Sequence, residues 1–62
     1  STLHVVARAE VDELDSSVLL SSKTLESDEI SYTLASPNFE VLKAIEVSLR
    51  GNSSVISIQL GK

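Results

Sequence analysis

The chain has 62 residues, a formal net charge of −4 at pH 7, no cysteine and a single histidine. This composition excludes a disulfide framework and the usual cysteine and histidine ligand sets of a zinc site. Basic residues are few and scattered, and the only aromatic residues are one tyrosine and one phenylalanine, so a cationic or base-stacking surface for nucleic acid is not expected. We therefore expect no metal, no cofactor and no direct contact with nucleic acid.

The length predicts one small domain over residues 1–62, with a thin core, because a chain of this size buries only about 60% of the surface that its unfolded form exposes. No segment reaches the ~20 apolar residues of a membrane span. The N-terminal residues lack the basic-then-apolar pattern of a signal peptide. These features predict no membrane contact and favour an intracellular location.

The first predicted element is a strand over residues 3–11. Apolar and polar residues alternate there with a period of two, which is typical of a half-buried strand. The inward-facing positions are Leu3, Val5, Ala7, Ala9 and Val11. On the opposite face, Val6 is an apolar exception among polar residues, and His4 is expected to be an exposed strand residue without a catalytic role.

Residues 12–28 leave two interpretations open. Asp12 could cap a short, irregular helix that contains Leu14, with acidic residues close to its positive N-terminal end. Alternatively, the segment SVLLSSKTL (residues 17–25) could form a strand, although its alternation breaks at Leu19 and Leu20. The serines of this segment compete for backbone hydrogen bonds and weaken the helical interpretation.

Carboxylates are concentrated just before and within this segment, at Glu10, Asp12, Glu13 and Asp15. A calcium loop would also need a glycine for its sharp turn, and no glycine occurs before Gly51. We interpret the four carboxylates as capping and solvating groups where a strand passes into the next element. A cation site at residues 10–15 is the alternative.

Two further strands are predicted, over residues 29–35 and 54–60. In the first, Ile30, Tyr32 and Leu34 share one face. The second is rich in β-branched residues, and Ile56, Ile58 and Leu60 alternate with Ser57 and Gln59.

A helix is predicted between these strands, over residues 37–49. Ser36 would be its N-cap, Pro37 its first residue, and Gly51 would follow its last turn. At 100° per residue the apolar side consists of Val41, Leu42, Ala44, Ile45, Ser48 and Leu49. Phe39 and Val47 project outside this apolar side.

The competing interpretation of the same region is a hairpin. Residues 45–50 would form a strand that turns at Gly51 and Asn52 and pairs with residues 53–60. We prefer the helix, because NFEVLKA shows no alternation. The expected fold is therefore α+β, a small and mostly antiparallel sheet of three to four strands with the helix 37–49 on one face, and the alternative is an all-β domain.

No residue pattern in the chain predicts catalysis, so we expect that it is not an enzyme. A thin core without disulfide or metal makes association with another chain a ready source of stability. We expect a non-catalytic protein–protein interaction module, either a homodimer or a small accessory subunit, whose interface includes Val6, Phe39 and Val47. The alternative is a small ligand- or cation-binding domain that uses the acidic segment 10–15.

Overall fold

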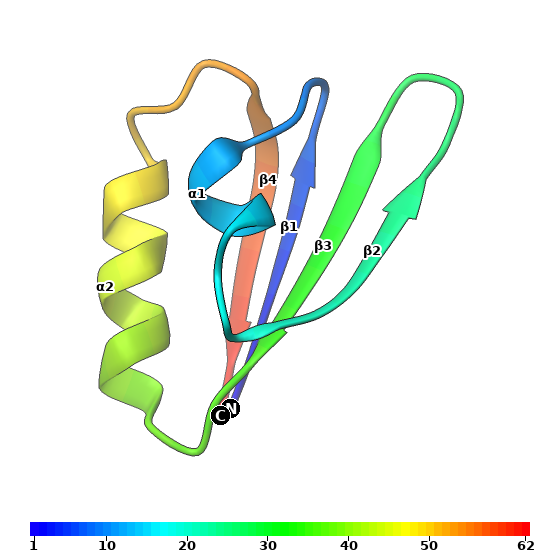
Figure 1. The fold of residues 1–62 in the computed structure, drawn as a ribbon. Helices are drawn as coiled ribbons and strands as arrows, with labels where there is room; N and C mark the ends of the chain where they lie inside the picture. The colour runs from blue at the N-terminus through cyan, green and yellow to red at the C-terminus, as the bar shows by residue number, and fades with distance from the viewer.

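The computed structural model describes all residues, 1–62, and shows one four-stranded antiparallel sheet with two helices (Figure 1). The predicted α+β fold is confirmed. The elements are β1 (Thr2–Ala7), α1 (Asp12–Asp15), β2 (Leu20–Leu25), β3 (Ile30–Ala35), α2 (Phe39–Leu49) and β4 (Val55–Gly61). Neither helix is long and apolar enough to cross a membrane.

The strands lie in the order β2-β3-β1-β4, so β1 is central and β2 and β4 form the two edges. All three pairings are antiparallel. The succession β-α-β-β-α-β is that of a split βαβ arrangement. β3, which follows β1 and β2 in the chain, lies between them in the sheet. Both helices lie on the same face of the sheet (Figure 1), which leaves the other face uncovered.

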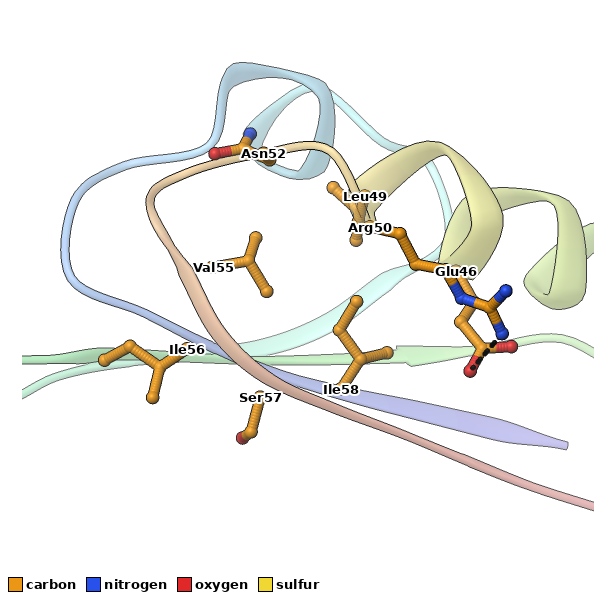
Figure 2. Close-up of a pocket in the computed structure, with 8 residues that line it drawn as sticks. All are labelled: Glu46, Leu49, Arg50, Asn52, Val55, Ile56, Ser57 and Ile58. Atoms are coloured by element: carbon orange, nitrogen blue, oxygen red, sulfur yellow. Dashed lines mark ion pairs between the residues drawn. The ribbon is translucent and has the colours of Figure 1, made fainter.

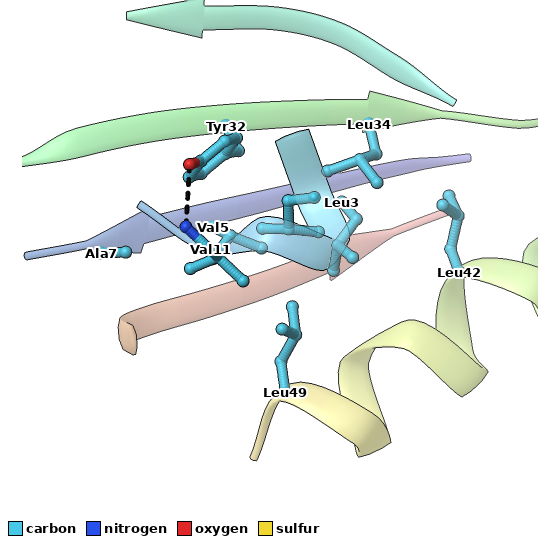
Figure 3. Close-up of a cluster of buried hydrophobic side chains, with 9 residues drawn as sticks. Leu3, Val5, Ala7, Val11, Tyr32, Leu34, Leu42 and Leu49 are labelled. Carbon is cyan, nitrogen blue, oxygen red and sulfur yellow. Dashed lines mark hydrogen bonds between the residues drawn. The ribbon is translucent and has the colours of Figure 1, made fainter. Parts of the chain in front are cut away.

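The hydrophobic core lies between the sheet and the helices (Figure 3). The period-two pattern of β1 and β3 directs alternate side chains into this layer, as predicted. The buried apolar residues are Leu3, Val5, Ala7, Val11, Leu14, Tyr32, Leu34, Leu42 and Leu49. Only 10 of the 62 residues are buried, so the core is as thin as the length predicts.

The first strand is shorter than the predicted range 3–11. It ends at Ala7, and although the Arg8 amide still donates to the Ser54 carbonyl at 2.8 Å, Ala9 is exposed. Val11 is buried, but as the residue that precedes α1. Its amide donates to Tyr32 Oη at 3.1 Å, and this contact requires the chain to leave the plane of the sheet.

Both interpretations of residues 12–28 contribute to the observed structure. A single helical turn, α1, is followed by the strand β2. Asp12 is not a capping residue, because Val11 occupies the N-cap position and makes no side-chain cap. The break in alternation at Leu19 and Leu20 is close to a register shift between Leu20 and Ser22, where β2 pairs irregularly with β3.

β4 confirms the predicted strand 54–60, with one change in its side-chain orientations. Its register against β1 shifts between Val6 and Ala7, so Ala7 pairs with Val55 and not with Ile56. Ile56 is therefore 44% exposed, whereas Val55, Ile58 and Leu60 pack against the core. A bulge of this kind reverses the alternation on one side of the irregular pair.

The predicted helix 37–49 is confirmed as α2, but its start is two residues later. Asn38 is the N-cap, and its Oδ1 accepts a hydrogen bond from the Glu40 amide at 3.1 Å. Ser36 Oγ instead accepts from the Asn38 amide at 3.0 Å, so Ser36 shapes the turn before the helix. The helical residues 45–49 exclude the alternative hairpin.

The buried side of α2 is narrower than the predicted apolar side. Leu42 and Leu49 are fully buried and Ile45 partly, but Val41 is 40% exposed and Ala44 and Ser48 are exposed. Ser48 faces α1, where its Oγ donates to Glu13 Oε2 at 3.3 Å. The phase of the helix is therefore shifted toward Leu42 and Leu49.

Candidate functional site

The acidic segment does not gather its four carboxylates at one point. Lys23 Nζ on β2 lies 2.7 Å from Glu10 Oε1 and 2.8 Å from Asp15 Oδ1, so an ammonium group of the chain itself lies between two of them. Glu13 contacts Ser48. No three histidine, cysteine or carboxylate side chains are arranged to hold a metal ion.

Tyr32 connects this ion pair to the core. Its hydroxyl accepts from the Val11 amide and donates to Asp15 Oδ1 at 2.9 Å, and the Lys23 ammonium lies 5.6 Å from the ring centroid. The hydrogen bond from Lys23 lowers the pKa of Asp15, and the same contact raises the pKa of Lys23. Burial raises the pKa of Tyr32. These groups join α1 to β2 and β3, which gives them a structural role.

The uncovered face of the sheet carries no formally charged side chain. His4 is exposed there, with its Nδ1 3.3 Å from Thr33 Oγ1. Side chains at paired positions lie on the same face of a sheet. The residues of this face are therefore those that pair with His4 and Val6 in β3 and β4, together with the β2 residues that pair with these β3 residues. This face includes Thr2, His4, Val6, Ser22, Thr24, Ser31, Thr33, Ser57 and Gln59.

The edge strand β4 has one open side. It pairs with β1 on one side and has no neighbour on the other. Its sequence, VISIQLG, contains no charged residue and no proline. The other edge strand, β2, carries Lys23, and a lysine is a feature that natural proteins use to prevent pairing at a sheet edge.

A groove of about 300 Å³ runs between β4 and the C-terminal part of α2 (Figure 2). The side chains of Val55 and Ile58 point toward the helix end, whereas Ser57 points away from it (Figure 2). The lining residues are Glu46, Leu49, Arg50, Asn52, Val55, Ile56, Ser57 and Ile58. The groove is therefore apolar at its base, with an acidic and a basic side chain on its helical wall.

The charges of this wall belong to one short network. Glu46 Oε1 accepts from Lys43 Nζ at 3.0 Å, while Glu46 Oε2 lies 3.8 Å from Arg50 Nη2. The Glu46 side chain is only 17% exposed, whereas that of Arg50 is 62% exposed. The guanidinium thus extends into solvent beside the β4 edge with a single, long contact to its own chain.

The three residues expected at an interface do not form one surface. Val47 is 53% exposed on α2, and Phe39 is half-buried at the start of α2, with Lys62 Nζ 5.2 Å from its ring centroid. Val6 lies on the uncovered face, which the sheet separates from α2. Their role in binding stays a prediction.

Sequence reasoning missed the β4 edge and its groove. The strand itself was predicted, but its position at the edge follows from the strand order, which the local pattern does not contain. The sequence does show that no charged residue occurs between Arg50 and Lys62.

Comparison with known proteins gives no relative: no family model, no curated protein and no solved structure matches the chain. Fold alone does not define function, so the functional argument rests on the surface just described.

Proposed function

We propose that this chain is a non-catalytic protein–protein interaction module, a homodimer or a small accessory subunit, that binds by strand addition at β4. The observation that carries the proposal is the uncharged open edge of β4 beside the α2 groove. An edge strand presents unpaired backbone N–H and C=O groups that can template another strand. In this mode the backbone supplies affinity, and pockets for alternate side chains supply specificity.

The groove is well placed to receive such side chains. Val55 and Ile58 provide its apolar contacts, and Arg50 stands at its rim. A strand aligned with β4 would direct every second side chain toward this groove, because side chains alternate between the faces of a sheet. The surface therefore combines a backbone template with a site for at least one apolar residue.

The distribution of titratable groups supports a non-catalytic role. Asp15, Lys23 and Tyr32 contact one another and hold α1 on the sheet. His4 is exposed, and its ring is next to a threonine hydroxyl. A base must lie within hydrogen-bond reach of its nucleophile and of an orienting group, and Asp15, Lys23 and Tyr32 instead serve the packing of the fold.

The thin core supports association as well. Small domains without disulfides or metals have little stability to spare, and binding that involves only the folded state adds to that stability by mass action. Pairing at β4 would also cover the part of Ile58 that the monomer leaves exposed.

Site-specific photo-crosslinking in the cells that produce the protein tests this proposal. A photoreactive phenylalanine derivative is placed at Gln59 on β4 or, as the matched control, at Thr24 on β2; both positions are exposed and lie on edge strands. We expect a crosslinked product from position 59 and none from position 24. Products from position 24 alone, or from neither position, would overturn the assignment to β4.

A further inference from the structure

The two ends of β4 differ in their regularity, which restricts where another strand can pair. The register irregularity against β1 affects Val55 and Ile56, whereas residues from Ser57 to Gly61 pair regularly with β1. A new strand on the open side needs a straight template, because bulges locally bend a strand and increase its twist. The regular part of the edge is therefore residues 57 to 61, and the central pairs of an added strand should lie within it.

Starting from the proposed function, on which this step rests, we infer that the partner is a second copy of this chain. The two copies pair β4 against β4 in antiparallel orientation about a two-fold axis at Ile58. Ile58 then lies opposite the partner's Ile58, and Ser57 lies opposite the partner's Gln59. Apolar residues oppose apolar ones and polar residues oppose polar ones, an arrangement that stabilises cross-strand pairs.

The α2 helices complete the contact on the covered face of the sheet. α2 packs over both β1 and β4, and neighbouring strands are about 4.8 Å apart. Two helices in this position, related by the axis at Ile58, would have their axes about 10 Å apart, which is the usual distance for direct helix packing. The joined sheet would thus bring two helix flanks together above it.

Charge complementarity favours a second copy over an unrelated occupant. The flank of α2 at the groove carries Glu46 and Arg50 one turn apart, and both line the groove together with Ile58. A two-fold axis reverses the direction of the second helix, so that each Arg50 can approach the partner's Glu46. The Arg50 guanidinium is free to make this contact with the second copy, because its contact within its own chain is long and its side chain is largely exposed.

The strand itself adds no repulsion to this arrangement. β4 is uncharged over its whole length, while most carboxylates of the chain lie between Glu10 and Glu29, in the α1 region and the turn between β2 and β3. Self-association at β2 would bring those acidic regions together. Association at β4 keeps them apart, since β4 is the opposite edge of the sheet.

Sedimentation equilibrium of the purified chain, from micromolar to millimolar concentration, tests this inference with two matched double variants. Ser57→Lys with Gln59→Lys places lysine opposite lysine at both cross-strand pairs of the dimer. Ser57→Lys with Gln59→Glu changes the same two exposed positions but places lysine opposite glutamate. Far-ultraviolet circular dichroism establishes that both variants are folded.

The unmodified chain is expected to show a monomer–dimer equilibrium. The lysine–lysine variant should raise the dissociation constant about tenfold or more, and the lysine–glutamate variant should keep it within about threefold. Equal effects of the two variants would overturn the antiparallel register at Ile58. A chain that stays monomeric throughout would overturn self-association, and a crosslink from position 59 to a different protein would then leave the proposed function standing with an extended segment of that protein on β4.

Discussion

At the scale of single residues, two carboxylates of the acidic segment are paired with one lysine that lies further along the chain. Glu10 and Asp15 both contact Lys23, which is separated from them by the whole loop before β2. The sequence predicted that these carboxylates lie where a strand passes into a helix. It contained no indication that Lys23 would reach them, because this contact depends on the pairing of β2 with β3.

The pair of Asp15 and Lys23 predicts a pH dependence of stability. The folded-state pKa of Asp15 is lowered, so its contribution is present above the unfolded value near 4 and is lost as the pH falls through the folded pKa. We expect Lys23→Gln to lower the free energy of unfolding at neutral pH, and the difference from the unmodified chain to shrink as the pH falls below about 4. Urea denaturation over a pH series measures this difference.

Lys62→Gln provides the matched control, because it removes the same charge from a lysine that forms no ion pair with a carboxylate. Its effect should not follow the titration of Asp15. If Lys23→Gln changes stability by the same amount at every pH, the Asp15 contact does not contribute as described.

At the scale of elements, the periodicity of the sequence predicted those strands and helices whose formation depends on neighbouring residues in the chain. The period of two identified β3 and β4, and the switch to a helical period identified α2. The prediction was wrong where contacts between residues distant in the chain determine the local structure. β1 ends early because Val11 turns to reach Tyr32. Ile56 is exposed because β4 is bulged opposite β1. Asn38 and Ser36 are both good capping residues, so the sequence alone does not decide between them.

The phase of α2 is testable by truncation of its side chains. Leu42→Ala and Leu49→Ala should each lower the free energy of unfolding by about 2–5 kcal/mol, since both residues are fully buried. Val47→Ala, on the exposed side of the same helix, should stay within about ±0.5 kcal/mol at low protein concentration. Urea denaturation at micromolar concentration gives all three values, and a loss at Val47 as large as that at Leu42 would show that the helix faces the other way.

At the scale of the whole molecule, the strand order creates the candidate interface. The residues of the segment VISIQLG do not indicate that it lies at an edge. β4 lies at an edge because, in the sheet, β1 is placed between β3 and β4. Once the order is known, the two edges are clearly different. Both edge strands have a register irregularity, but β2 carries Lys23, whereas β4 is uncharged and lies beside a groove lined by apolar and charged side chains.

The central claim, that β4 is the surface through which the chain associates, is tested most directly by backbone amide hydrogen exchange at micromolar and millimolar concentrations. Strand pairing protects amides on the open side of β4 that exchange with solvent in the monomer. We predict that exchange in residues 57–61 slows as concentration rises while exchange in β2 does not change. Rates in β4 that are the same at both concentrations, or protection that appears in β2 instead, would contradict the claim.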